Sequence, residues 1–354
     1  MSRINVGVIG YGLRSSSLIA VLGQFKEVRL AAIADTSPSA LKRATADHPG
    51  VETFADHSAM LDSGRVEAVL IESPPPTHAS CAIDAMQRGI HVLSDVPAVH
   101  TIEEARMLWD AGWKTHAVYM LGATTNFWAY VDACLDMKKK GLLGDPFYLE
   151  AEYVADLGNL PELTPWRKHY EPIRYCTHSL GPVLKWIDED LAEVSCFSTG
   201  GRVRKDPKDN DAMVAIFRTR SGIVVKLLTC FVNRHPVPYH RYVCQGTKGY
   251  FEKTQPLAGG ECQVLLSTDQ VYGMRGLTEL PVTEKHPEHA HEVGLGGHGG
   301  ADGLMIADFL AAVAGDKQPE VNMREAIRMS LPGLYALESA RAGGQLTKIS
   351  YPWE

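Results

Sequence analysis

The first 120 residues alternate short apolar runs with helix-like stretches, and this alternation constrains the fold more than any other feature. The apolar runs are INVGVIG (4–10), VRLAAIAD (28–35), VEAVLIES (66–73) and HVLSDVP (91–97). The helix-like stretches are 16–25, 37–47 and 78–89. Strands that helices cover on both faces are apolar nearly throughout, so the pattern predicts a doubly wound parallel sheet with crossover helices.

Beyond residue 121 strand-like runs follow one another without helices between them. These runs are 146–156, 193–203, 211–219, 222–232, 241–253 and 262–268. One helix over about 126–141 leads into them, and two helices at about 301–314 and 323–342 close the chain. We therefore expect an α/β domain over 1–121 and an α+β domain over 122–354 with a large, mostly antiparallel open sheet.

The composition narrows the partners. The chain has 354 residues, a formal net charge of -7 and 45% apolar residues, so it has no basic field for nucleic acid or an anionic membrane. We expect neither partner. There is no apolar run of the roughly 18–20 residues that a membrane span needs, and residue 4 onward is already strand-like, so we expect a cytoplasmic protein. The seven cysteines are odd in number and scattered, which predicts reduced packing residues.

A nucleotide site is predicted at the first strand–helix turn, VIGYGLRSSS. Gly10 and Gly12 let the backbone approach a pyrophosphate at the helix N-terminus, with Leu13 and Arg14 next in the turn. Asp35 ends the second strand 25 residues beyond Gly10, where it can accept hydrogen bonds from a ribose and repel a 2'-phosphate. NAD is therefore expected in preference to NADP. The alternative is that Asp35 only caps the helix that follows.

Two later turns extend this site. In ESPPPTHA, Ser73, Pro74 and Pro75 can line the dinucleotide cleft. His78 is placed with them, although its simplest role is a hydrogen bond at the helix start. In SDVPA, Asp95 can face the cofactor while Pro97 fixes the turn; the alternative is an acid at a helix N-terminus followed by a turn proline.

The motif RYCTHSLGPV (174–183) contains a candidate proton-transfer pair. A spacing of three puts Tyr175 and His178 on one side of a helical turn. We expect Pro182 within the first turn of the helix behind them. A histidine is a plausible proton carrier beside a sugar hydroxyl, and a tyrosine can complete the relay. The alternative is that both side chains only pack.

The stretch GGHGGADG brings in His298 and Asp302, whose glycine neighbours would let a loop close over a ligand. It could equally be a connector capped by Asp302. Metal binding through His286, His289, His291 and His298 rests on count alone, because no helical HExxH or carboxylate frame accompanies them, and we predict no metal.

The order GYG, IAD, ESPPPTHA, HVLSDVP and then a sheet-based domain resembles the Gfo/Idh/MocA oxidoreductase family over nearly the whole chain. The resemblance implies a Rossmann domain for NAD and a second domain whose open sheet carries a sugar or polyol. The family typically has Glu-Lys-Pro after the fifth strand, where its lysine assists the reacting hydroxyl. Here the residues are Asp95-Val96-Pro97, and a valine can neither donate nor accept a proton.

The stretches YLEAEYVAD, PWRKHYEPIRYCTHSLGPV and GGHGGADGLMIADFL are similar to the NAD-dependent glycosidase branch, the α-N-acetylgalactosaminidase-like hydrolases. That branch carries a valine in place of the lysine and a Tyr-x-x-His-x-x-Gly-Pro motif. The resemblance puts Tyr175 and His178 on its catalytic positions. It puts Tyr153 and Arg167 on sugar-contacting ones, with Trp166 beside them. An acid that the branch presents near Ala123 is missing, so its particular sugar is not implied.

Three functions are open. In a redox-neutral glycosidase, NAD oxidises a sugar hydroxyl, the C1 leaving group is eliminated, water adds and the hydride returns. A plain sugar or polyol dehydrogenase would stop at the keto product and release NADH. A sensor would bind NAD or sugar without catalysis. For each enzyme reading we expect a sugar or glycoside substrate and a homodimer or homotetramer formed through the C-terminal sheet.

Overall fold

The structure, a computed structural model, describes residues 3–158, 160–235, 238–254, 263–274, 276–282, 296–315 and 317–354. The chain divides into two compact units. The first unit contains residues 1–124, 285–327 and 353, and the second contains 125–284, 328–352 and 354. Each is described by itself below.

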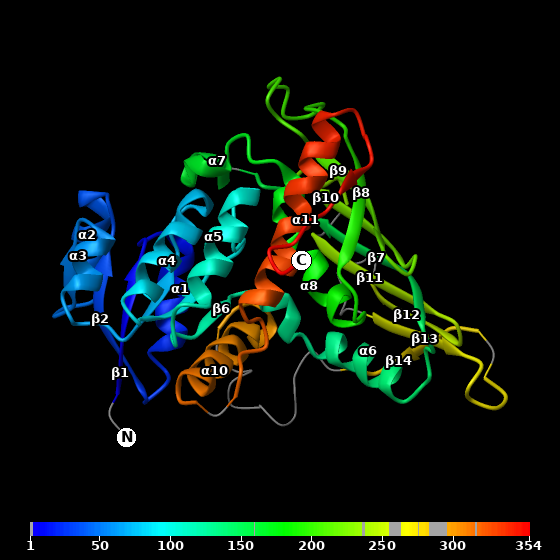
Figure 1. The fold of residues 1–354 in the computed structure, drawn as a ribbon, viewed down its shortest axis with the longest axis horizontal. Coiled ribbons are helices and arrows are strands. Elements are labelled where there is room, and N and C mark those ends of the chain that lie inside the picture. Colours follow the sequence, from blue (N-terminus) through cyan, green and yellow to red (C-terminus); the bar gives the residue numbers. More distant parts are fainter. Residues whose placement is uncertain are drawn as a thin grey trace. The chain divides into compact units, whose positions relative to one another are not determined.

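The first unit contains a parallel sheet of six strands in the order β3-β2-β1-β4-β5-β6, which is the Rossmann order. Three of these strands, β1, β2 and β6, are labelled in Figure 1. The strands are β1 (Ile4–Ile9), β2 (Val28–Ala34), β3 (Glu52–Phe54), β4 (Ala68–Ile71), β5 (His91–Ser94) and β6 (Tyr119–Leu121). The predicted doubly wound parallel sheet is confirmed. The apolar runs did not include β3 and β6, which have three residues each and are too short to show a period.

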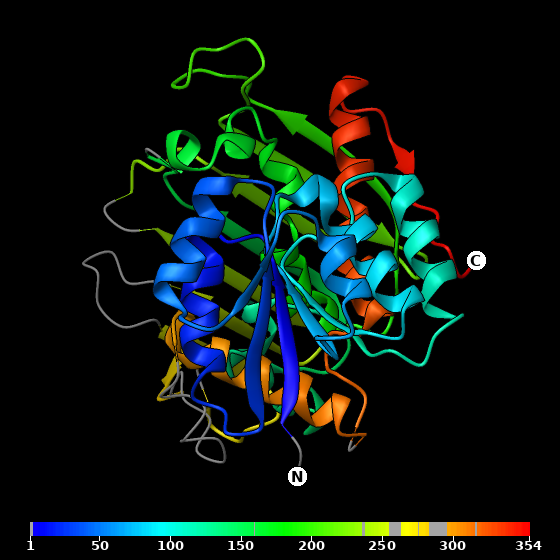
Figure 2. The ribbon, with the colours of Figure 1, turned by 90° about the vertical axis from the view of Figure 1, so that its left-hand side faces the viewer.

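Helices connect these strands, as Figure 2 shows from the side of this unit. The connecting helices are α1 (Leu13–Leu22), α2 (Pro38–Asp47), α3 (His57–Asp62), α4 (His78–Gln87) and α5 (Ile102–Gly112). The unit also contains α10 (Ala301–Val313), which joins no two of these strands. Capping residues mark where two of these helices begin. Helix α2 has Ser37 as its N-cap, followed by Pro38 in the first helical position, and α5 begins with a Thr101–Glu104 capping box. Helix α10 comes from far along the chain and packs against α1.

The second unit contains a nine-stranded sheet in the order β14-β13-β12-β11-β7-β10-β9-β8-β15. The strands are β7 (Pro146–Val154), β8 (Leu191–Ser198), β9 (Ala212–Thr219), β10 (Val224–Cys230), β11 (Tyr239–Gly246), β12 (Gly249–Thr254), β13 (Gln263–Thr268), β14 (Thr278–Leu280) and β15 (Thr347–Lys348). Strands β7 and β10 pair parallel and the other neighbours antiparallel, so the predicted sheet type is confirmed. The single run expected over 241–253 is two strands, β11 and β12.

The helices of this unit are α6 (Ala129–Lys139), α7 (Leu160–Leu163), α8 (Thr177–Lys185) and most of α11 (Met323–Arg341), whose first turn belongs to the first unit. Helix α8 packs on β7 and β11. Behind it Trp186 is fully buried, and its indole N–H donates to the Val131 carbonyl (2.9 Å). The inner face of the sheet and this indole form the core that holds α8 in place.

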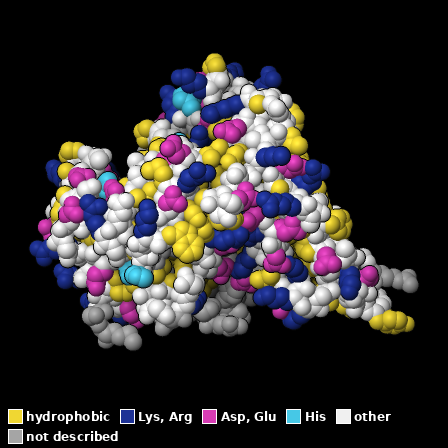
Figure 3. All heavy atoms as spheres, viewed as in Figure 1, with side chains coloured by type: hydrophobic (Ala, Val, Ile, Leu, Met, Phe, Trp, Pro, Cys, Tyr) yellow, Lys and Arg dark blue, Asp and Glu magenta, His cyan; other side chains and the backbone are white. Residues whose placement is uncertain are grey.

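On the surface, basic and acidic side chains are interspersed over the face drawn in Figure 3, without a large patch of either sign. Within the described ranges, no helix is both long and apolar enough to span a bilayer.

Candidate active site

In the first unit, the strands end in one continuous row. The last ladder pairs join Ile9 to Ala34 and Ile71, Ile71 to Ser94, and Ser94 to Leu121. One step further along lie Asp35, Gly10, Glu72, Asp95 and Gly122, which we call the carboxyl row. Its backbone continues the ladder, since Glu72 N–H donates to Ile9 (2.8 Å) and Asp95 N–H to Ile71 (2.9 Å). Ligands of such sheets bind at this edge, near the β1/β4 crossover.

The two glycines of the first turn fit a nucleotide. Gly10 has φ +93°, and a Cβ there would lie 2.7 Å from the Ser73 nitrogen, so the tight turn requires glycine. Gly12 is the N-cap of α1, and a Cβ there would meet nothing within 4 Å. Open space therefore adjoins the free N–H groups of a helix N-terminus, with the exposed Leu13 beside it.

Asp35 ties this turn to the second strand. One carboxylate oxygen accepts from Tyr11 N–H and the other from Ser37 N–H, each at 2.7 Å. The cap of α2 is Ser37, whose hydroxyl oxygen accepts from Ala40 N–H, so capping is not the role of Asp35. Each carboxylate oxygen has a further lone pair that a ribose hydroxyl could use.

The turns after β4 and β5 are joined by His78, which is 1% exposed. Its Nδ1 lies 2.9 Å from the Pro97 carbonyl oxygen and its Nε2 lies 2.7 Å from that of Ser73. The imidazole therefore positions the two predicted cofactor turns. Pro74 leads into the short 3₁₀ turn that Pro75 begins.

Val96 occupies the position at which the family that this sequence resembles typically carries a lysine, and it is 5% exposed. Its side chain is packed inside the unit. Because a valine side chain carries no proton donor or acceptor, this position cannot supply one to a ligand at the carboxyl row.

Arg14, His298 and Asp302 form a network inside the first unit. The two terminal nitrogens of Arg14 donate to the two oxygens of Asp302 (3.0 and 2.6 Å). Gly297 N–H also donates to Asp302 (3.1 Å), and His298 Nδ1 lies 3.2 Å from it. Although burial works in the opposite direction, the bonds from His298 and Arg14 hold the pKa of Asp302 well below its usual value. Asp302 thus binds Arg14 from the second residue of α10. Residues 286–295 of the predicted loop lie outside the described residues.

The second unit brings Tyr153, Tyr175 and His178 into one aromatic cluster. Tyr175 ends a 3₁₀ turn and His178 is the second residue of α8, with their ring centroids 4.7 Å apart. Tyr153 of β7 lies 5.3 Å from Tyr175 and stacks at 6.1 Å on His178. The expectation that spacing of three places the phenol and imidazole together agrees with this geometry.

The expected position of Pro182 is wrong, because α8 begins at Thr177 and Pro182 lies in its second turn. A proline there cannot donate to the His178 carbonyl, four residues earlier. The hydroxyl of Tyr242, a fully buried residue of β11, donates to that carbonyl instead (2.6 Å). Tertiary packing thus replaces the missing backbone bond and holds the turn that carries His178.

Gly181 is required by a neighbour in the same unit. A Cβ at this position would lie 2.1 Å from Oδ1 of Asn126, which is also buried. The Gly-Pro pair of the motif therefore combines close packing at Gly181 with a His178 carbonyl that accepts from Tyr242 instead of from residue 182.

Arg167 and Trp166 lie beside the aromatic cluster. The Arg167 guanidinium stacks 4.3 Å from the Trp166 ring centroid, and Trp166 meets Tyr170 edge-on at 5.2 Å. Burial, and next the nearby Tyr175, raise the pKa of Tyr153, while the charge of Arg167 opposes this shift. Tyr153 is thus a protonated phenol at neutral pH, able to donate a hydrogen bond.

His240 was missed by the sequence analysis. It pairs with Tyr153 across β11 and β7, with ring centroids 4.9 Å apart, and lies 6.5 Å from His178. Its Nδ1 is 3.2 Å from the Tyr242 oxygen. Because that hydroxyl gives its hydrogen to the His178 carbonyl, His240 must be the donor, with its proton on Nδ1. Alternation along β11 gives the face of His240, but its partner strand is visible only in the folded sheet.

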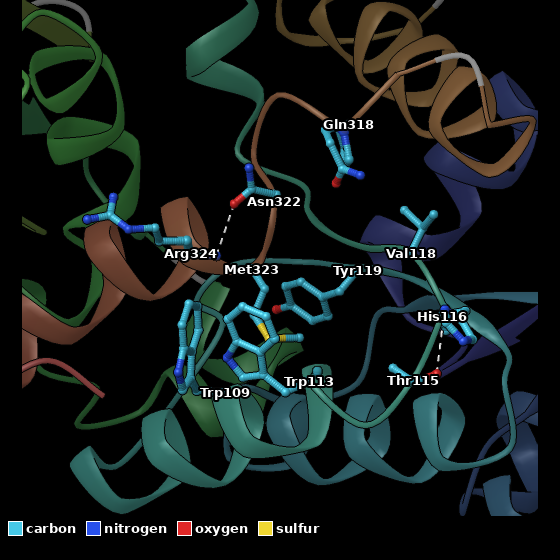
Figure 4. A pocket seen from close by; sticks show the side chains of 13 residues that line it. Trp109, Trp113, Thr115, His116, Val118, Tyr119, Gln318, Asn322, Met323 and Arg324 are labelled. Carbon is cyan, nitrogen blue, oxygen red and sulfur yellow. Dashed lines mark hydrogen bonds between the residues drawn. The ribbon is translucent and has the colours of Figure 1, made fainter. Parts of the chain in front are cut away.

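A separate pocket of about 500 Å³ lies in the first unit between α5, the start of β6 and residues 318–324 (Figure 4). Trp109, Trp113 and Tyr119 line it together with Asn322 and Arg324. No predicted site residue is among those lining it. Within the described part of the chain, no group of three or more His, Cys, Asp or Glu could hold a metal, and His286, His289 and His291 lie outside that part.

Residues 4–123 match the model of an oxidoreductase family with an NAD-binding Rossmann fold, Gfo/Idh/MocA. This part of the chain belongs to the Gfo/Idh/MocA family. The resemblance is thereby confirmed. The Rossmann fold of this family binds NAD, which is the cofactor that the turn around Gly10 and Gly12 predicts.

Relatives extend the likeness over the rest of the chain. A glycosyl hydrolase family 109 protein of Solibacter usitatus is 28% identical over 98% of this chain and 87% of its own length. An α-N-acetylgalactosaminidase of Shewanella oneidensis is 26% identical over 86% of this chain and 75% of its own. Levoglucosan dehydrogenase in complex with NADH and levoglucosan has the same fold, with a TM-score of 0.82 and 19% identity over 99% of this chain and 100% of that chain.

Proposed function

We propose that the protein is an NAD-dependent glycosidase of the redox-neutral kind. The observation that carries the proposal is the Tyr175–His178 ring pair, 4.7 Å apart, in a chain whose Val96 is buried where a lysine would assist a plain dehydrogenase. Relatives named as glycosyl hydrolase family 109 proteins and α-N-acetylgalactosaminidase support it.

NAD would accept a hydride from a sugar ring carbon and later return it. We assign binding of the nucleotide to Gly10, Gly12 and Asp35, because these combine a tight turn, open space at a helix N-terminus and a strand-end carboxylate. Leu13, Arg14, Ser73, Pro74, Pro75, His78, Asp95 and Pro97 flank or position that site.

In the second unit, His178 would take the proton of the sugar hydroxyl or of the neighbouring C–H, with Tyr175 completing the relay. Tyr153, as a neutral phenol, would donate a hydrogen bond to the sugar, and Arg167 would bind its polar groups with Trp166 stacking beside it. We also assign His298 and Asp302 to substrate binding. The observation behind this assignment is their hydrogen-bond network with Arg14 of the nucleotide turn.

The test compares Tyr175→Phe and His178→Ala with Tyr250→Phe, which removes a hydroxyl on the opposite face of the sheet. Each of the first two variants should lower hydrolysis of aryl glycosides by about 10²- to 10⁴-fold, the reach of general acid–base catalysis, without loss of bound NAD. Tyr250→Phe should keep turnover. Near-normal turnover in both motif variants would reject the assignment.

The reaction itself is tested by the fate of the hydride. A glycoside deuterated at the oxidised carbon should show an isotope effect while no NADH accumulates. Stoichiometric NADH with a keto sugar would establish the plain dehydrogenase instead. NAD binding with no turnover of any glycoside or free sugar would instead support the third hypothesis, a sensor that binds NAD or sugar without catalysis.

We also propose that a second copy covers the outer face of the large sheet. Phe197 of β8 pairs directly with Val214 of β9, and both are exposed on that face together with Ile216. Three exposed apolar side chains in one patch are consistent with an interface. Light scattering should show a dimer or tetramer that Phe197→Asp weakens, and a monomeric wild type would refute this.

A further inference from the structure

Glu72 is an acid in the carboxyl row to which no role has yet been assigned. It lies one step beyond the Ile71–Ser94 ladder pair, and Asp95 lies at the same step on β5. Register partners on parallel strands point to the same side of a sheet about 5 Å apart. Two carboxyl groups at that spacing do not both ionise readily.

Arg14, a cation near Glu72, forms its ion pair with Asp302. Arg14 gives its two terminal nitrogens to Asp302, whose carboxylate also accepts from Gly297 N–H. Asp302 therefore forms the direct ion pair with Arg14. Glu72 and Asp95 interact with the Arg14 charge only electrostatically, without a hydrogen bond to it.

The surroundings favour a neutral Glu72. Burial raises its pKa well above the usual value, the charge of Asp95 adds to this, and Arg14 opposes it in part, with Asp302 a further contribution upward. The Oε2 atom is buried, and among the described residues it has no hydrogen-bond partner. A buried carboxyl oxygen without a partner is costly, so a ligand that supplies one would bind favourably.

Glu72 also adjoins the nucleotide turn. The Cβ that Gly10 lacks would come within 2.8 Å of Glu72 backbone carbon and 2.7 Å of Ser73 nitrogen. The backbone of Glu72 therefore lies at the crossover between β1 and β4, where a dinucleotide binds in this fold. On the row it stands between Gly10 and Asp95, on the side of the sheet away from Asp35.

We propose that Glu72 acts as a neutral carboxylic acid that donates a hydrogen bond to the nicotinamide-nucleotide half of NAD. Its ribose hydroxyls and carboxamide oxygen are acceptors. An ionised Glu72 has no proton to donate and would repel the pyrophosphate, so NAD binding weakens when Glu72 ionises. The inference concerns cofactor binding and does not depend on which sugar reaction the enzyme performs.

The experiment measures the Kd of NAD by calorimetry from pH 5.5 to 9, on full-length protein stripped of nucleotide and without sugar. In the wild type, Kd should be constant at low pH and rise by up to about tenfold per pH unit above the ionisation of Glu72, as expected for one linked proton. Glu72→Gln keeps a neutral donor of the same shape. Its Kd should stay flat over this range, within about threefold of the low-pH wild type.

Asp95→Asn is the matched second variant. It removes the neighbouring charge, so the rise in Kd should begin at lower pH than in the wild type, a change that a purely structural role would not produce. AMP, which contains only the adenosine half, should bind equally to wild type and Glu72→Gln at each pH.

A flat wild-type profile, or a Glu72→Gln profile with the wild-type rise, would overturn the proposal. An AMP profile that rises like that of NAD would overturn the assignment to the nicotinamide half. Circular dichroism over the same pH range checks that each variant stays folded.

Discussion

The hydroxyl of Tyr242 should be worth more to stability than an ordinary tyrosine hydroxyl, and Tyr242→Phe tests this. The hydroxyl donates at 2.6 Å to the His178 carbonyl, which Pro182 deprives of its helical N–H. Tyr242 is fully buried and His178 is 8% exposed, so water does not readily replace the bond. A buried acceptor left without a partner costs about 1–3 kcal/mol, and we expect a loss of about 2 kcal/mol.

A matched control exists in the same unit. Tyr335 also donates to a backbone carbonyl, that of Ser350 at 3.3 Å, but the bond is exposed to water. Tyr335→Phe should therefore lower the free energy of unfolding by less than about 0.5 kcal/mol.

The second half of the test uses Pro182→Ala. An alanine at this position has an N–H that can reach the His178 carbonyl four residues earlier, so it supplies a backbone donor in addition to the tyrosine hydroxyl. In this background Tyr242→Phe should cost at least about 1 kcal/mol less than in the wild type, a coupling of the size found for groups that share a partner.

The assay is urea unfolding followed by far-UV circular dichroism and by tryptophan fluorescence. Free energies are compared only where the two transitions coincide, because a chain with two units need not unfold in one step. Equal losses from Tyr242→Phe in both backgrounds, or a loss like that of Tyr335→Phe, would refute the idea that the hydroxyl replaces the proline's missing N–H.

Four further outcomes are expected. Gly181→Ala should lower the free energy of unfolding by about 1–3 kcal/mol because its methyl group would overlap Asn126, and urea titration of Gly181→Ala with Asn126→Ala should recover part of the loss. Asp35→Ala should weaken the preference for NAD over NADP in a binding titration while the protein stays folded; an unchanged preference would limit Asp35 to its backbone bonds. Arg14→Met should cost about 3 kcal/mol, since it leaves the carboxylate of Asp302 buried without its cation. Because the folded-state pKa of Asp302 is lowered, its contribution is present above about pH 4 and is lost as the pH falls further, so urea stability from pH 6 to 3 should decline less in Asp302→Asn than in the wild type.

The nucleotide-binding unit could be predicted from local signals. Its strands read as apolar runs, and Gly10, Gly12 and Asp35 occur at spacings that a strand–turn–helix unit imposes. The pairing of Tyr175 with His178 was predictable for the same reason, since three residues make nearly one helical turn. What the sequence could not indicate was the helix start at Thr177, because the usual rule against interior proline assumes that no other donor reaches the freed carbonyl.

The sequence by itself thus determined the parallel sheet, the nucleotide turn, the valine where the resembled family typically has a lysine, and the tyrosine–histidine pair, because each depends on residues close together in the chain. Only the tertiary structure decided that Arg14 binds Asp302, 288 positions away, that His240 faces Tyr153, and that Glu72 stands beside Asp95. Periodicity and turn chemistry are local properties and can be read in order. Partners across strands and between distant helices follow from register and packing, which leave no local signature in the chain.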